Sequence, residues 1–582
     1  MSRRTAPGPL APPRPVARAA GLVALLGSLA AALGAAPVQA QNRPAPGLDI
    51  DPALDALNPL GTAVQAGSRR AEAALSGNPT EAERRDLVDP ATGSFRHVVA
   101  PRNAATAPPW FFTLGAEATA TSNVGMEPLA QASSDLVLGL RPAVQIDTRS
   151  AGWRLSGQAA LQLRHYAQNR RGDEALPSAD LDGSARLVDR WLWLDGRIAA
   201  AALPVSPFVS AVPGSRGVQE STRWTLGPRL DHELDPLTRV SGHALLTHQH
   251  QTGGDLSVDS SSRTLDQALS WSRLPRPLGL RIEAQSQETT VPSLSAPVFE
   301  RRTLRGVLGW SADPQLVVDL RGGHDSSTWG INHRSGPLSG AGLTWLPSPR
   351  SRLELNGEHH ALGTDWRLSA SHRSPGLALS LEARREFGSS ATLLGRLGNG
   401  GRVAELLDQM FATRITDPLL RAAAVQDFIT RRGLGETLAD PVALYSDRAQ
   451  ENRRLTLTAG LMGVRHVVSL SLYRDTSLDL PGDPLLSGLL SGDARQTGWS
   501  LGLNRRLDLL TSADASLSGS RATGLNANAG RDNRELALRL TLNHELTPRT
   551  QASAGLRRVL QTTSDGGRAR EVALTVGVQH RF

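Results

Sequence analysis

Cysteine is absent from this sequence of 582 residues, and lysine is absent as well, so all 63 basic side chains are arginine. Without cysteine there are no disulfides, thiolate metal sites, cysteine nucleophiles or lipoprotein-type anchors. Aromatic residues make up only 4% of the chain. No apolar run after residue 40 reaches the ~18 residues that a membrane-spanning helix needs. These absences exclude thiol chemistry and a helical membrane protein.

The net charge of +8 does not indicate a nucleic-acid partner. Four of the arginines, at positions 3, 4, 14 and 18, lie in the first 40 residues, which contain no acidic residue. The remaining 59 arginines and 55 acidic residues leave +4, and the two signs alternate along the chain. Nucleic-acid binding needs a basic stripe or a recognisable module, so no nucleic-acid partner is expected.

Residues 1–40 have the pattern of a secretory signal peptide. Basic residues precede an apolar segment, Ala19 to Ala36, and Val38-Gln39-Ala40 offers small residues for cleavage before Gln41. A short N-terminal membrane anchor is the alternative, but the segment lacks charged stop-transfer flanks. The pattern therefore predicts export. Residues 41–109, which are rich in proline, alanine, glycine and charge, predict a disordered periplasmic extension.

From residue 110 onward, apolar and polar residues alternate, which is typical of half-buried strands. In the last segment, Val572, Leu574, Val576 and Val578 alternate with small or polar residues. Runs of this kind are about ten to fourteen residues long, whereas sandwich strands usually have five to six. A tilted strand that crosses a bilayer needs ~9–11 residues. The alternation predicts an all-β fold over 110–582, a transmembrane antiparallel β-barrel of about 22 strands, give or take about two to four.

The connections between these runs alternate between short and long. The short ones carry proline-containing turns such as Asp235-Pro236 and Thr547-Pro548, and a tight link near 362–363 is the exception on the long side. Outer-membrane barrels have short periplasmic turns and longer outer loops. The longest connection, 388–450, carries helical spacing over 402–433. This loop is expected to enter the lumen, to cap the outer mouth or to extend over the surface.

Three sets of residues follow from the predicted barrel. Tryptophans near the periplasmic turns form a candidate interfacial girdle: Trp153, Trp191, Trp193, Trp271, Trp310 and Trp345. Charged residues on the polar faces are candidates for lining the lumen: Arg352, Glu354, Glu358, Arg367, Arg373, Arg539 and Glu545. Such charges either set ion selectivity or form a solvated wall of paired groups. The terminal residue, Phe582, is a candidate assembly signal.

No catalytic, cofactor-binding or metal-binding set can be distinguished. His248 and His250 share one strand face, but a metal site needs at least a third ligand, which the sequence does not place. Serine and aspartate are so frequent that no nucleophilic triad stands out. The sequence therefore predicts no enzyme and no cofactor.

Four short motifs carry a resemblance to a known family. They are Thr121–Val124 followed by Ser134–Val137, Leu192–Arg197 after Ala185–Val188, Asp417-Pro418 with Arg421–Val425, and Gly463–His466 with Leu470–Arg474. Over about 110–582 the chain resembles the outer-membrane β-barrels associated with the PEP-CTERM/exosortase system and exopolysaccharide loci. Arg465-His466 stands where the resemblance leads us to expect Arg-Asn, a small departure. Phe582 resembles the aromatic carboxyl end that the barrel-assembly machinery recognises.

The resemblance implies an outer-membrane location and a link to surface polysaccharide, but it supplies no activity. The first hypothesis is a porin-like channel or export component for exopolysaccharide secretion. The alternative is a structural or binding barrel that anchors surface polysaccharide or a secretion partner, and a barrel enzyme that modifies polysaccharide is a third. The expected partners are outer-membrane lipid, the barrel-assembly machinery and exopolysaccharide or its secretion components.

Overall fold

The computed structural model describes residues 110–582, except 151, 169–170, 190, 205, 211, 213–217, 253–259, 276, 293–297, 314, 390–402, 413–414, 416–420, 422–423, 426–427, 430–441, 443–447, 482–491 and 565–566. The predicted signal peptide and the predicted extension lie outside the described residues, as does much of the loop 388–450. Within the described part of the chain, no helix is long and apolar enough to cross a bilayer.

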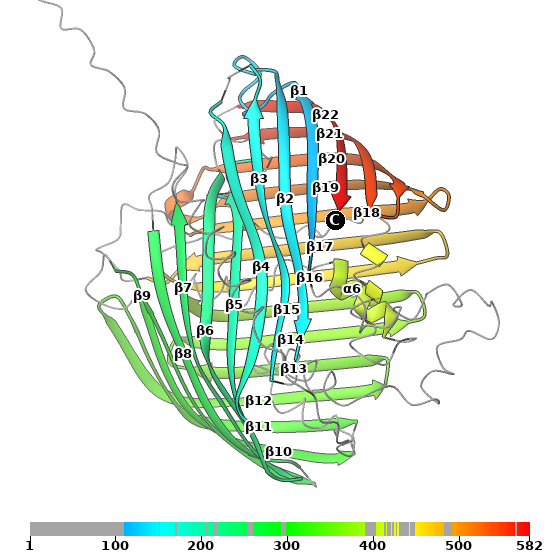
Figure 1. Cartoon of the computed structure of the whole chain (residues 1–582). Helices are drawn as coiled ribbons and strands as arrows, with labels where there is room; N and C mark the ends of the chain where they lie inside the picture. The colour runs from blue at the N-terminus through cyan, green and yellow to red at the C-terminus, as the bar shows by residue number, and fades with distance from the viewer. Residues whose placement is uncertain are drawn as a thin grey trace, which may run out of the picture.

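Twenty-two strands form a single closed antiparallel sheet, which confirms the predicted barrel and its strand number (Figure 1). The first eleven are β1 (Trp110–Thr121), β2 (Asp135–Arg149), β3 (Trp153–Tyr166), β4 (Glu174–Val188), β5 (Leu192–Pro204), β6 (Val218–Asp235), β7 (Thr238–Thr252), β8 (Ser260–Arg273), β9 (Leu278–Thr290), β10 (Phe299–Asp313) and β11 (Leu316–Trp329). The others are β12 (Asn332–Ser348), β13 (Ser351–His360), β14 (Gly363–Ser374), β15 (Leu377–Ser389), β16 (Ala449–Met462), β17 (His466–Asp479), β18 (Ala494–Arg506), β19 (Thr511–Gly524), β20 (Asp532–Thr547), β21 (Thr550–Thr563) and β22 (Arg568–Arg581). The described helices are α6 (Val403–Phe411) and the short 3-10 turn η3 (Asn526–Asn528).

The barrel wall is apolar outside and polar inside, the reverse of a soluble protein. On β10, the outward residues Leu304 and Leu308 are 57% and 50% exposed, whereas the inward residues Thr303 and Arg305 are buried. A closed barrel satisfies every backbone hydrogen bond within the wall, so its outer surface can face hydrocarbon. This apolar belt identifies a barrel of the outer-membrane type.

The two rims of the barrel differ in the length of their connections. One rim holds tight turns such as 349–350, 375–376 and 548–549, and the barrel begins and ends there. The other rim holds the long connections, including 390–448, together with tight links at 330–331 and 361–362. The sequence predicts only the second of these tight links. By the usual orientation of such barrels, the short-turn rim faces the periplasm.

The turn between β18 and β19 is organised by a carboxylate outside the membrane-spanning strands. Asp508 accepts hydrogen bonds from the backbone N–H groups of Leu510 and Thr511, each at 2.7 Å. Together with the Thr511 hydroxyl, these donors hold the pKa of Asp508 below its usual value, with the Leu510 N–H as the largest cause. The charged form of Asp508 is therefore part of the turn.

The pairing of β1 with β22 closes the barrel and is fastened by buried polar contacts. Glu571 on β22 is 1% exposed and accepts two hydrogen bonds from Arg557 on β21, at 2.9 and 2.7 Å. It also accepts one from the Thr121 hydroxyl on β1, at 2.8 Å. At the chain end, the Phe582 N–H donates to the Phe112 carbonyl at 2.9 Å. The seam is thus held by one carboxylate that links three strands.

The long connection between β15 and β16 sends helix α6 into the lumen (Figure 1). Its buried residues pack against Ala378, Val467 and the partly buried Met462, which lie within a residue or two of the short-turn end of their strands. Val425 and Ile429 from the same loop belong to this cluster. Its members on the loop side are Val403, Leu406, Leu407, Met410, Phe411, Val425 and Ile429, with Phe428 at the edge. Of the three expectations for this loop, entry into the lumen holds for its described helix.

Candidate functional site: the charged lumen

The structure places the predicted lumen charges on the inner face of the wall. On β13, Arg352, Glu354 and Glu358 lie on the face opposite the outward Leu355, which is 46% exposed. The same alternation brings Arg367 and Arg373 of β14 to the inner face, since Arg367 is registered with Asn356. On β20, Arg539 and Glu545 occupy inner positions between outward leucines.

Ion pairs on the inner wall connect neighbouring strands and also strands that are not neighbours in the sheet. Arg305 on β10 contacts Glu358 on β13 at 2.7 Å and Glu283 on β9 at 3.3 Å. Arg301, also on β10, contacts Asp325 on β11 at 2.8 Å and Asp365 on β14 at 3.1 Å. Long arginine side chains reach across the curved inner surface and neutralise carboxylates several strands away. We call this network the arginine ladder.

The arginine ladder continues onto β15 and along β11. Arg384 contacts Glu382 at 3.4 Å and Glu386 at 3.2 Å. The guanidinium of Arg321 lies 2.5 Å from Asp319 and also donates to Asn356. A fully buried His360 side chain lies 3.0 Å from Asp365. Charged groups are thus paired along much of this wall.

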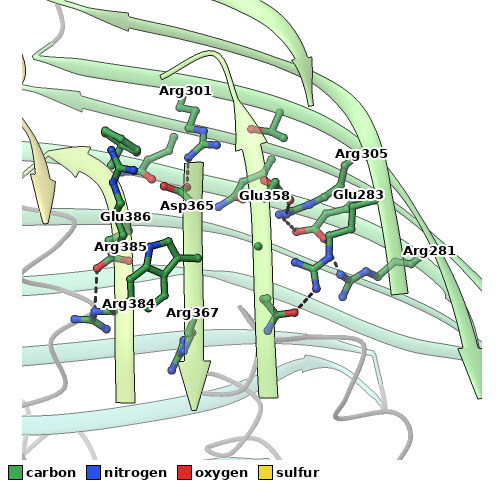
Figure 2. Close-up of a pocket in the computed structure, with 18 residues that line it drawn as sticks. Arg281, Glu283, Arg301, Arg305, Glu358, Asp365, Arg367, Arg384, Arg385 and Glu386 are labelled. Carbon is green, nitrogen blue, oxygen red and sulfur yellow. Dashed lines mark hydrogen bonds and ion pairs between the residues drawn. The ribbon is translucent and has the colours of Figure 1, made fainter. Parts of the chain in front are cut away.

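A cavity of about 140 Å³ opens onto the arginine ladder, and we call it the ladder cavity (Figure 2). Among the described residues that line it are seven arginines and four carboxylates: Arg281, Arg301, Arg305, Arg321, Arg367, Arg384, Arg385, Glu283, Glu358, Asp365 and Glu386. Each guanidinium has five N–H donors and no acceptor. Within the described residues, the buried Nε atoms of Arg281 and Arg305 have no hydrogen-bond partner. The cavity is therefore richer in donors than in acceptors.

A second cavity, of about 500 Å³, lies near the periplasmic rim beside α6, and we call it the helix cavity. Arg352, Arg373 and His372 line it from the strands, Arg350 lines it from the turn between β12 and β13, and Gln409 lines it from α6. Arg352 is paired with Glu354 and Arg373 donates to the Pro349 carbonyl at 3.1 Å. No carboxylate is present among the described residues that line this cavity.

The candidate tryptophan girdle requires one correction. Trp310 and Trp345 face outward and are 46% and 45% exposed, and Trp191 lies at the same rim in ring contact with His232. Trp153 and Trp271 are half-buried on the outward faces of β3 and β8. Trp193 is instead 6% exposed and lies on the inner face, between Arg186 and Arg229.

Trp193 was predicted to lie at the membrane interface, but its side chain points into the lumen. Proximity to a periplasmic turn suggested the girdle, but Trp193 shares the inner face with Asp195, which Arg229 contacts at 2.7 Å. At the opposite rim, Trp224 and Trp499 face outward on β6 and β18, each 37% exposed. Neither tryptophan belongs to the girdle predicted from the sequence, although Trp499 shares the apolar face of its strand with Leu501.

The histidines that the sequence singled out are not brought together with metal ligands in the described part of the chain. Among the described residues, no three histidine or carboxylate side chains are placed to hold a metal ion. His248 contacts the outward Trp224, with ring centroids 5.6 Å apart, and His250 lies on the same outer face. Phe582 is 62% exposed, with its ring 5.6 Å from that of Phe112 at the seam.

No family model and no curated protein matches the chain. Solved structures similar to it are outer-membrane receptors and porins with very low sequence identity. The FrpB iron transporter from Neisseria meningitidis is 9% identical, with a TM-score of 0.42 over 82% of this chain and 83% of that chain. The siderophore receptor PirA from Acinetobacter baumannii is 8% identical, with a TM-score of 0.41 over 82% of this chain and 81% of that chain. OccK3 (OpdO) from Pseudomonas aeruginosa is 12% identical, with a TM-score of 0.30 over 81% of this chain and 96% of that chain. Similarity at this level does not extend to ligands or activity.

Proposed function

We propose that the chain is an outer-membrane export channel for exopolysaccharide, closed at its periplasmic end by helix α6. The observation that carries this proposal is the polar inner wall, along which the arginine ladder and the helix cavity follow one another. Rings and rows of charged side chains in a lumen control which solutes pass. A wall of guanidinium, amide and hydroxyl groups suits a hydrated, hydroxyl-rich polymer.

The link to exopolysaccharide comes from the resemblance carried by the four motifs. Residues of two of those motifs lie at positions that organise the barrel. Asn123 in the β1–β2 connection is fully buried and donates to the carbonyls of Glu127 and Arg570, at 2.8 and 3.2 Å. Trp193 and Asp195 lie on the inner face beside Arg229. These contacts give the motif residues a structural role at the seam and in the lumen.

A second candidate function is a closed barrel that anchors surface polysaccharide or a secretion partner. The position of α6 favours it, because a helix packed on the inner wall narrows the lumen. In the export channel, helix α6 has to move out of the lumen to let the polymer pass. In the anchoring barrel, α6 stays on the inner wall.

The test is single-channel conductance of the refolded protein in a planar bilayer, with and without residues 390–448. Ser389 and Ala449 are paired in register, so a two-residue Asn-Gly turn can replace the loop without disturbing β15 or β16. We expect small or intermittent conductance from the intact protein and a large steady conductance from the deletion. If neither the intact protein nor the deletion variant conducts, although heat-modifiable gel mobility shows that both barrels are folded, the channel is rejected and the anchoring barrel remains.

The exopolysaccharide link has its own test. A strain that lacks this protein is expected to secrete less polymer into the medium, and the full-length protein is expected to restore secretion. An unchanged amount of secreted polymer would reject the link while leaving a conducting barrel intact.

A further inference from the structure

We infer that the polymer this lumen takes is acidic, with carboxylate groups that bind arginines in the ladder cavity and then in the helix cavity. This inference rests on the proposed export function and names its substrate class.

The ladder cavity has an arginine with little compensation, Arg281. Its side chain is only 6% exposed, and its ion pair with Glu283 is long, at 3.7 Å. Glu283 lies nearer to Arg305, at 3.3 Å. The Arg281 Nε has no partner among the described residues. A buried guanidinium whose carboxylate partner is this distant gains most from an added carboxylate, because charge-assisted hydrogen bonds are the strong ones.

The carboxylates of the ladder cavity are already engaged. Glu358 accepts from Arg305 at 2.7 Å, and Asp365 lies within reach of both Arg301 and His360. Their charge is therefore neutralised within the wall and repels an anionic ligand only weakly. A neutral sugar would leave Arg281 with only its long ion pair to Glu283, whereas a uronate would supply a closer carboxylate.

Uncharged groups in the same cavity suit the rest of a sugar. Gln285, Gln287 and Thr303 line it beside the arginines, and each can exchange hydrogen bonds with hydroxyl groups. The ring of Phe387 also borders the cavity. The lining therefore combines anion donors, hydroxyl partners and an apolar ring face.

The helix cavity offers the same chemistry closer to the periplasm. Its three arginines face the space with no lining carboxylate among the described residues. The two cavities share the inner rows of β13 and β14: Arg352 and Asn356 stand four residues apart on one strand, and Arg373 and Arg367 stand six apart on the other. At ~3.3 Å per residue these separations are about 13 and 20 Å, the reach of a few sugar units. A single chain segment can contact both cavities.

The experiment measures binding without requiring conduction. The full-length barrel, refolded in detergent, is titrated calorimetrically with galacturonate hexamer, with neutral maltohexaose and with inorganic phosphate. We expect the acidic hexamer to bind at least about tenfold more tightly than the neutral one, because each charge-assisted hydrogen bond is worth a factor of ten or more. Binding of phosphate alone at comparable affinity would show a simple anion site and overturn the inference of a saccharide.

Variants locate the binding. Arg281→Gln is expected to weaken hexamer binding about tenfold, with Arg281→Lys intermediate because it keeps the charge. Arg302→Gln is the matched control, since Arg302 follows Arg301 on β10 but faces outward with a 72% exposed side chain. Equal binding of acidic and neutral hexamers, or unchanged binding by folded Arg281→Gln protein, would overturn the inference. Binding that persists in a barrel that never conducts would reject the export channel and retain the site.

Discussion

Removal of the Glu571 carboxylate at the barrel seam is expected to destabilise the folded barrel by about 3 kcal/mol. The change is Glu571→Ala. It deletes the acceptor of two hydrogen bonds from Arg557 and one from Thr121, and with it the contact that ties β21, β22 and β1 together. The Arg557 guanidinium then stays at the inner wall without its carboxylate.

The magnitude follows from the exposure of the two partners. Breaking a buried ion pair by removing one partner costs about 3–5 kcal/mol, because the other charge is left uncompensated. Glu571 is 1% exposed, but the Arg557 side chain is 21% exposed and can regain water from the lumen. The cost is therefore placed at the lower end of that range, with the Thr121 hydroxyl adding about 1 kcal/mol or less.

The assay is urea-induced unfolding of the protein in lipid vesicles, followed by the fraction that keeps its heat-modifiable gel mobility. Glu571→Gln, which keeps the shape and loses the charge, is expected to fall between the wild type and Glu571→Ala. Glu300→Ala is the control, since its partner Arg302 is 72% exposed and such pairs contribute about 0–1 kcal/mol. If Glu571→Ala lowers the free energy of unfolding by less than about 0.5 kcal/mol, Glu571 does not stabilise the seam between β1 and β22 as argued.

Three further predictions concern the plug helix, acid stability and the membrane belt. Gly460→Val is expected to dislodge α6 and raise conductance, because a Cβ at this position would lie 2.1 Å from the Met410 methyl group, whereas Gly322→Val has open space and is expected to change nothing. The pKa of Asp508 is lower in the folded than in the unfolded protein. Its contribution to stability is therefore fully present above its unfolded-state pKa and is lost as pH falls through its folded-state pKa. Asp508→Ala is expected to flatten the acid limb of a curve of unfolding free energy against pH. Brominated lipid is expected to quench the fluorescence of a single-tryptophan protein that retains Trp310 and to leave one that retains Trp193 unquenched, and the reverse order would contradict the assigned faces.

The fold was predictable from the sequence because a barrel wall is one layer thick. Each residue faces either lipid or lumen, so polarity alone records its direction. The run 534–545 lies within β20, Asp532–Thr547, and the first run 111–121 falls one residue short of β1. Periodicity of two thus located the strands and their number, and the alternation of short and long connections gave the orientation of the hairpins.

The lumen network was not predictable in the same way. Contacts such as Arg301 with Asp365 join strands that are four apart in the chain order, and they depend on the curvature and stagger of the closed wall. Sequence alternation gives the face of a side chain but not its height in the barrel. Trp193 shows the converse limit, since its height near a turn was evident and its face was misjudged.

Closure of the seam also determines how the barrel can form. Every other strand pair joins neighbours in the chain, whereas Thr121 and Glu571 are 450 residues apart. Chain-entropy scaling puts the closure of a loop of that length at about 5 kcal/mol above its constant part. Until closure, β1 and β22 are two open sheet edges whose backbone groups cannot be satisfied in hydrocarbon. Consecutive strands can therefore pair early, but the pairing of β1 with β22 requires both edge strands to be in place. A slow closure step prolongs the exposure of these two edges and raises the risk that they pair with a second chain.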